Sequence, residues 1–235
     1  MWKRVTFRIY LLVVLISCLN LNVFADNIGS DKLLTEANQL LSEYKDCEAL
    51  ERFEQVIALE PQHVEALCKA SVLCGRIGNR FTDDTRKSEY FHKAQEFARK
   101  AWLVDSTDAE TNYSVALALG ISSQTANLKE RLILLSQVKT YTDRALQYNP
   151  NHAGAWHVLG RWRFKVANLS FAEKAANKYL VSSPPPSATN EEALEAIKHA
   201  IYLDPNNLLF YYDLAQIQLE AVSYTHLTLP TICSV

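Results

Sequence analysis

The sequence predicts an all-α fold, a right-handed helical solenoid built from paired helices with insertions between them. Two observations predict it: a pattern of small and apolar residues that recurs four times, and a Pro or a substitute for Pro at the end of each occurrence. In addition, only six glycines occur in 235 residues, which argues against an all-β fold with many tight turns. Hydrophobic residues make up 49% and charged residues 21%, an ordinary composition for a globular chain that buries a core.

The recurring pattern begins in EALERFEQVIALEP, whose residues Ala49, Phe53, Val56 and Pro61 are spaced by 4, 3 and 5. The same spacing returns three times, at Ala94, Ala98, Ala101 and Ser106, at Val138, Thr142, Ala145 and Pro150, and at Ala193, Ile197, Ala200 and Pro205. Apolar residues three and four apart line one helix face, and a Pro ends each unit. The pattern A-x3-F-x2-A-x4-P is typical of the second helix of a tetratricopeptide repeat.

The first helix of a repeat is clearest in WHVLGRWRF, where Trp156, Leu159 and Gly160 match W-x2-L-G. Leu67 and Tyr211 stand at the same offset in two other repeats. We expect Trp156 and Leu159 in the core, and Gly160 to let two helices approach closely. No repeat can bury its apolar face alone, so neighbours should stack into a solenoid with an inner, concave groove.

The repeats are longer than the standard tetratricopeptide unit. Counting Ser106 as a Pro substitute, the ends of the pattern lie 45, 44 and 55 residues apart, against 34 in the standard repeat. Insertions of 11, 10 and 21 residues therefore separate paired helices, near 79–85, near 122–129 and after Val166. We expect them to form loops on one face. The last contains a helical segment and then SSPPPSATN, in which Thr189 or Asn190 should cap the next helix.

The second half of the chain carries a more specific set of motifs. A W-x-x-L-G-R-W helix, a V-x-x-L-x-x-x-E-K helix, a Pro-containing loop and an EEAL helix follow one another, with these places held by Trp156, Leu159, Gly160, Arg161, Trp162, Val166, Leu169, Glu173 and Lys174. In this order they resemble the tetratricopeptide-type domain of the regulator of microtubule dynamics family and its bacterial relatives, over residues 30–221. The resemblance implies a binding scaffold, with microtubule association as the role of the animal members.

The first 25 residues have the features of a signal peptide. Three positive residues precede an apolar run over 9–16, and Ala25 stands at a cleavable position. Cleavage there predicts a secreted or periplasmic protein. Two alternatives stay open, and both tether the chain to a membrane as a structural or envelope-assembly protein. One is a lipobox-like segment that makes a lipoprotein at Cys18, and the other is an uncleaved N-terminal anchor.

No motif for catalysis, for a metal or for a cofactor occurs in the sequence. CxxC, HExxH, GxSxG, the P-loop and GxGxxG are all absent, and the histidines fall at no metal-ligand spacing. We expect the histidines at the surface and the cysteines beyond the leader as small buried residues, namely Cys47, Cys68, Cys74 and Cys233. A net charge of −2, without a basic block beyond the first ten residues, argues against a nucleic-acid partner. The sequence therefore predicts a non-enzymatic protein.

A partner-binding groove can be placed from the repeat pattern. In tetratricopeptide folds the inner surface comes from the first helices, one residue after the Trp position, four residues after that, and nearby. This rule selects Tyr113, Leu117, His157, Arg161, Lys165, Tyr212 and Gln216. Aromatic side chains with Arg suit a protein or peptide partner. The alternative is that Arg161 pairs with an acid on the neighbouring helix.

The chain ends in a segment unlike the rest. VSYTHLTLPT, which begins at Val222, resembles the read-through translation of a transposase sequencing adapter. We therefore expect residues 30–221 to form the native part of the solenoid and residues 222–235 to be a non-native tail. The helix over 208–221 should then end the solenoid, with Tyr211 and Leu214 facing a second helix that is missing.

Overall fold

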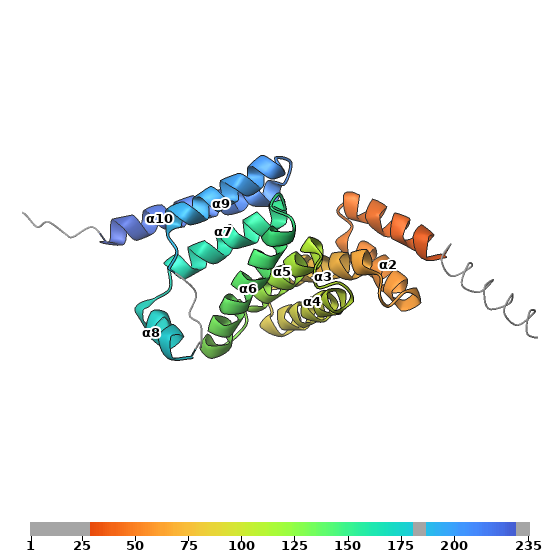
Figure 1. The fold of residues 1–235 in the computed structure, drawn as a ribbon, viewed down its shortest axis with the longest axis horizontal. Helices are drawn as coiled ribbons and strands as arrows, with labels where there is room; N and C mark the ends of the chain where they lie inside the picture. Colours follow the sequence, from red (N-terminus) through yellow and green to blue (C-terminus); the bar gives the residue numbers. More distant parts are fainter. Residues whose placement is uncertain (1–28, 181–186, 229–235) are drawn as a thin grey trace, which may run out of the picture.

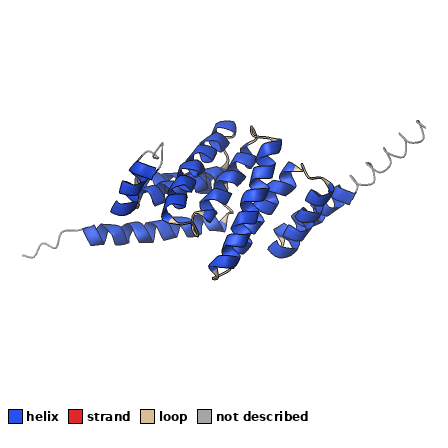
Figure 2. Ribbon diagram, turned by 90° about the horizontal axis from the view of Figure 1, so that it is seen from below, coloured by secondary structure: helices blue, strands red, loops and turns tan. Residues whose placement is uncertain are grey.

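The computed structural model describes residues 29–180 and 187–228, and every regular element within these ranges is an α-helix (Figure 2). A helix over 29–42 comes first; it is followed by α2 (Asp46–Leu59), α3 (Val64–Gly78), α4 (Asp84–Val104), α5 (Ala109–Ser122), α6 (Leu128–Tyr148), α7 (Ala153–Ala167), α8 (Phe171–Leu180), α9 (Asn190–Leu203) and α10 (Leu208–Thr228). The molecule is elongated, with α2 towards one end and α9 and α10 towards the other (Figure 1). The predicted all-α solenoid is confirmed.

The helices pair as the repeat pattern predicts. The most extensive contacts join α3 to α4, α5 to α6, and α7 to α9. The residues of the A-x3-F-x2-A pattern are buried in all four repeats, each with at most 2% of its surface exposed: Ala49, Phe53, Val56, Ala94, Ala98, Ala101, Val138, Thr142, Ala145, Ala193, Ile197 and Ala200. The pattern therefore marks the packing face of every second helix.

Side-chain caps set where most helices begin. In seven helices a capping side chain accepts the backbone N–H three residues further on: His63, Asp83, Asp108, Asn127, His152, Ser170 and Thr189. Thr189 and Glu192 form a complete capping box, which confirms the predicted start of α9. Each cap satisfies an N–H that has no partner within its helix, worth about 1 kcal/mol.

The first two insertions do not form the loops expected from the sequence. They lengthen the second helices instead: α4 and α6 each have 21 residues, whereas α2 and α9 each have 14. Seven extra residues add roughly 10 Å of helix. The reason is local, because Asp83 and Asn127 cap each helix early and neither helix contains a Pro or a Gly.

The third insertion forms α8, which stands apart from the paired helices and contacts α6 (Figure 1). An ion pair of 2.7 Å between Arg131 Nη2 and Glu173 Oε1 joins the two helices. At the base of the insertion, Asn168 Nδ2 donates to Asn190 Oδ1 at 2.7 Å. This bond ties the end of α7 to the beginning of α9, so the insertion leaves the repeat intact. The aromatic side chain of Phe171 is 90% exposed.

Two large clusters of buried apolar side chains meet at α5. The first extends from the helix over 29–42 to α5, where it includes Ala118. The second extends from α5 through α6 and α7, and includes Ala116 and Trp162. Ala116 and Ala118 lie on different faces of α5, two residues apart. This helix therefore belongs to both halves of the solenoid.

Helices α7 and α9 approach closely at Gly160, as predicted. A Cβ atom at this position would lie 2.6 Å from two carbons of Ile197 and 3.0 Å from the carbonyl oxygen of Ala193. Leu159 is buried as expected. Trp156 is only half-buried, contrary to the expectation, because its indole N–H reaches out to the carbonyl oxygen of Pro150 at 2.7 Å.

We expect Gly160→Ala to destabilise the protein by about 1–2 kcal/mol, because the new methyl group overpacks a rigid contact. Alanine is the better helix former, so helix propensity alone would give the opposite sign. Gly120→Ala is the matched control, since its Cβ would meet nothing closer than Val138 Cγ2 at 3.9 Å. That variant should gain up to roughly 1 kcal/mol. Urea unfolding measures both, and shifts of the same sign would contradict this account of Gly160.

The expectation that the last helix ends at residue 221 is wrong, because α10 continues to Thr228. No Pro or Gly interrupts the sequence before Pro230, and the residue preceding a Pro is disfavoured in a helix. The leader over 1–25, with Cys18, lies outside the described residues, as does the rest of the tail. No helix in the described ranges is both long enough and apolar enough to span a membrane.

Candidate partner-binding surface

The structure places the seven expected partner-binding residues on α5, α7 and α10, with very different exposure. Lys165 and Tyr212 are exposed, Tyr212 to 66%. Half-buried positions are held by Tyr113, Leu117 and Gln216. The remaining two, His157 and Arg161, take part in a polar cluster between α7 and α10.

The cluster between α7 and α10 is centred on Asp213. His157 Nε2 donates to Asp213 Oδ2 at 2.6 Å, and Arg161 Nη1 donates to Oδ1 at 2.7 Å. The side chains of His157 and Asp213 are each 8% exposed, while that of Arg161 is 45% exposed. Phe210 stacks on the imidazole at 4.7 Å. Arg161 therefore pairs with an acid on the neighbouring helix, and His157 is buried rather than at the surface.

Tyr113 packs against the beginning of α7. Its ring centroid lies 4.6 Å from that of His152, and burial raises the pKa of its phenol well above the ordinary value. His152 Nδ1 accepts the N–H of Ala155, so Nε2 carries the proton and donates to Glu110 at 3.0 Å. Burial is the largest single effect and would raise the pKa of Glu110, but the hydrogen bond from His152 and the electrostatic effects of His152 and Lys69 together lower it. This cluster links α5 to α7.

The other potentially reactive groups are also structural. Cys68 and Cys74 are buried as expected, and burial raises the pKa of each thiol to about 12. Both remain protonated and unreactive at neutral pH. Cys47 is exposed, contrary to the expectation, because it lies two residues from Ala49 on α2 and points away from the packing face. Cys233 lies outside the described residues.

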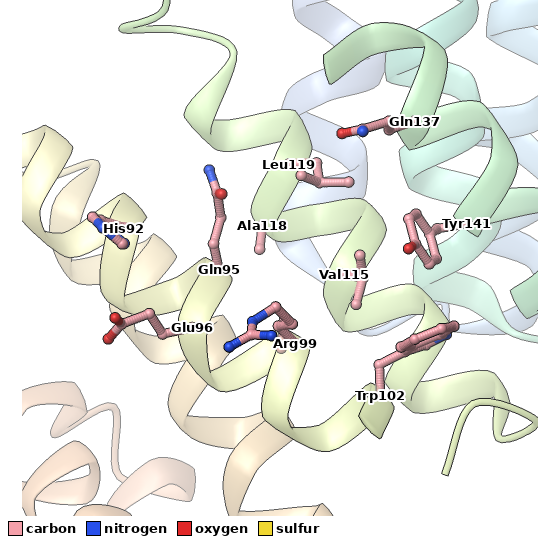
Figure 3. A pocket seen from close by; sticks show the side chains of 11 residues that line it. His92, Gln95, Glu96, Arg99, Trp102, Val115, Ala118, Leu119, Gln137 and Tyr141 are labelled. Atoms are coloured by element: carbon pink, nitrogen blue, oxygen red, sulfur yellow. The ribbon is translucent and has the colours of Figure 1, made fainter. Parts of the chain in front are cut away.

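A cleft of about 240 Å³ opens between α4 and α6, with α5 as its floor (Figure 3). We call it the α4–α6 cleft. Its apolar surface comes from Ala98 and Trp102 of α4, Val115, Ala118 and Leu119 of α5, and Tyr141 of α6. Polar side chains stand around them: His92, Gln95, Glu96, Arg99 and Gln137.

The α4–α6 cleft lies on the opposite face of α5 from the expected groove. At 3.6 residues per turn, Tyr113 and Leu117 share one face of α5, and Val115, Ala118 and Leu119 fall on the other. None of the seven expected residues lines the cleft. The sequence rule missed it because that rule selects first helices alone. The excess length of the repeats was the available signal, since it lengthens α4 and α6, which form the walls.

An aromatic pair closes one end of the cleft. The rings of Trp102 and Tyr141 are nearly perpendicular, with centroids 6.0 Å apart. The guanidinium of Arg144 lies 5.5 Å from the Tyr141 centroid. In the part of the chain that the structure describes, neither Arg99 nor Glu96 forms an ion pair. The cleft thus combines an apolar floor with polar groups that are free to bind.

Paired helices and buried repeat positions define a fold of the tetratricopeptide repeat class. The fold is shared with a thermophilic tetratricopeptide repeat protein of Thermus thermophilus, with a TM-score of 0.52 and 17% sequence identity, over 81% of this chain and 99% of that one. More particularly, the chain belongs to the family of regulator of microtubule dynamics proteins 1–3, whose model matches residues 33–226. The predicted family resemblance is confirmed.

Curated relatives of this family match the chain at low identity. Regulator of microtubule dynamics protein 1 of Bos taurus is 26% identical over 168 residues, which cover 72% of this chain and 49% of the relative. Regulator of microtubule dynamics protein 3 of Xenopus laevis is 28% identical over 123 residues, which cover 52% of this chain and 26% of the relative. The chain thus spans half or less of the length of these relatives.

Proposed function

We propose that the protein is a non-enzymatic scaffold that binds a protein or peptide partner on the inner face of its solenoid. The observation that carries this proposal is the exposure of Tyr212 on α10, 66% open, together with the exposed Lys165 and the partly exposed guanidinium of Arg161 on α7. Tyrosine and arginine are the residues that most often anchor protein interfaces. A partner that covers them would bury aromatic surface next to positive charge.

The states of the reactive side chains support a non-enzymatic role. His157 is committed to Asp213 by a short hydrogen bond and is covered by Phe210. His152 uses both ring nitrogens, one for the cap of α7 and one for Glu110. Both imidazoles hold helices together: His152 through both ring nitrogens, and His157 through Nε2 under the cover of Phe210.

Export is proposed from the leader over 1–25. Membrane tethering through Cys18 or through an uncleaved leader is the alternative. Mass spectrometry of the mature protein separates them: Asp26 as first residue supports export, and a lipidated Cys18 contradicts it.

A second candidate function, association with microtubules, is favoured by the family to which the chain belongs. Co-sedimentation with polymerised tubulin tests it.

Tyr212→Ala should weaken peptide binding about tenfold while leaving the fold intact, because an exposed aromatic anchor is removed. Peptides are selected from a random phage-displayed library on the purified chain, and their affinities are measured by fluorescence anisotropy. Tyr202→Ala is the matched control, since Tyr202 is a 79% exposed tyrosine on the second helix α9. Equal affinities for the two variants would place the partner elsewhere, and a library without any enriched peptide would contradict peptide binding altogether.

A further inference from the structure

The α4–α6 cleft lies where the two apolar clusters meet. Ala98 and Ala118 belong to the first cluster, and Leu119 and Tyr141 pack on the second. Both walls pack on α5, whereas α4 and α6 have no comparable contact with each other. Figure 3 shows the side chains of Val115 and Leu119 between the two walls. Apolar surface of α5 is therefore accessible at the junction of the two halves.

The size of the α4–α6 cleft indicates what kind of group it holds. Its volume of about 240 Å³ falls below the range of roughly 300–1,000 Å³ that is usual for sites of drug-sized ligands and cofactors. His92, Glu96 and Gln137 line the cleft and are exposed, so it opens to solvent along its rim. A small apolar cleft open to solvent suits a single large side chain that belongs to a larger partner.

The charges around the cleft indicate which residue should stand next to that apolar side chain in the partner. Arg99 lines the cleft, and Arg144 lies over Tyr141; neither forms an ion pair with an acid among the described residues. A guanidinium beside an aromatic ring is suited to bidentate recognition of a carboxylate. Glu96, one turn before Arg99, restricts the position of an incoming acid to the end of the cleft near Trp102. Charge complementarity therefore favours an acidic residue next to the apolar one.

We propose that the α4–α6 cleft is a second docking site, separate from the inner face, for a partner segment with a large apolar side chain next to Asp or Glu. The apolar side chain contacts the floor of Val115 and Leu119, beside the edge-to-face pair of Trp102 and Tyr141. The adjacent carboxylate accepts hydrogen bonds from Arg99. This site goes beyond the inner-face scaffold, because it uses the opposite face of α5 and the lengthened second helices.

The test uses a random dodecapeptide phage library panned on the full chain, with Tyr212→Ala in place to remove the inner-face anchor. We expect enriched peptides that carry Phe, Tyr, Leu or Met within two residues of Asp or Glu. Their affinity, measured by fluorescence anisotropy, should fall about tenfold in Arg99→Glu and in Trp102→Ala. Glu96→Lys should raise it several-fold, because it removes a like charge.

Matched controls are available on the same helix. Lys100→Glu makes the same change of charge as Arg99→Glu, but Lys100 lies over Phe97 and does not line the cleft. Leu103→Ala shortens a 61% exposed side chain next to Trp102. Both variants should bind the enriched peptides with an affinity within twofold of that of the parent. Arg99 is exposed, so its variant should keep the circular dichroism and melting temperature of the parent, even if Trp102→Ala loses stability.

Three outcomes would overturn the docking site. Enriched peptides without an acid, or with basic residues, would refute the assigned chemistry. Equal binding by Arg99→Glu and Lys100→Glu would refute the location. A library that yields peptides only on the parent with intact Tyr212 would refute the second site while leaving the inner-face proposal standing, so the two proposals fail separately.

Discussion

Arg161→Glu should destabilise the protein by about 3 kcal/mol, because it removes the partly exposed partner of a buried carboxylate and places a like charge beside that carboxylate. Asp213 is nearly inaccessible to water, with 8% of its side chain exposed, and Arg161 Nη1 lies 2.7 Å from its Oδ1. His157 would remain as the only hydrogen-bond donor to Asp213 among the contacts described. Urea unfolding with circular dichroism detection measures the change.

Lys165→Glu controls for the change of charge on α7, one turn beyond Arg161. Lys165 is exposed, and its charge acts on the carboxyl of Glu173, whose pKa it helps to lower, without a direct ion pair among the described residues, so its variant should lose no more than about 1 kcal/mol. In an Asp213→Asn background, Arg161→Glu should lose most of its effect, because the neighbouring charge has gone. A small loss for Arg161→Glu in the parent would mean that the guanidinium serves the inner face and not the α7–α10 contact.

Replacing Arg76 and Arg80 together by Ala should destabilise the first half of the solenoid by about 3 kcal/mol. Asp46, at the first residue of α2, has a side chain that is 0% exposed. Arg76 Nη2 lies 3.1 Å from its Oδ1, and Arg80 donates a hydrogen bond to its Oδ2. The loss should fall at the lower end of the range for buried pairs, because the arginines are partly exposed and their removal admits water.

The same double variant with Asp46→Asn tests the electrostatic cause. A neutral amide in place of the carboxylate should recover part of the lost stability, because no uncompensated charge is then buried. Hydrogen exchange should report the loss in α2 and α3 before it appears in α9. If Asp46→Asn recovers nothing, packing of the arginine stems would be the larger contribution.

The packing of the second helices was predictable because it follows from spacing alone. Phe53 and Ile197 lie in different repeats, yet both are completely buried at the same place in the pattern. Gly160 was predictable for a related reason, since a Gly within a helix is explained by close approach of a neighbour. Thr189 followed from the chemistry of helix caps. Each of these predictions was made from a motif of residues near one another in sequence, even though Gly160 contacts the distant Ile197.

The polar clusters could not be predicted in this way. Asp213 follows Arg161 by 52 residues, and the insertion that contains α8 lies between them. The sequence analysis gave, as the alternative to partner binding, that Arg161 pairs with an acid on the neighbouring helix, but it did not identify which acid. The α4–α6 cleft was missed for a different reason. Seven residues added to a repeat can form a loop or two more turns of helix, and the two cases differ little in amino-acid composition. Only the two more turns of helix, as found in α4 and α6, form the walls of the cleft.

The place of α5 between the two apolar clusters has a mechanical consequence. Both apolar clusters pack on this helix, and the α4–α6 cleft lies on one side of it, opposite the face proposed for the partner. A side chain inserted into the cleft would act as a wedge, spreading α4 from α6 and tilting the halves towards each other across the inner face. Binding in the α4–α6 cleft would then change the curvature of the solenoid, and with it the length of inner face available to a partner.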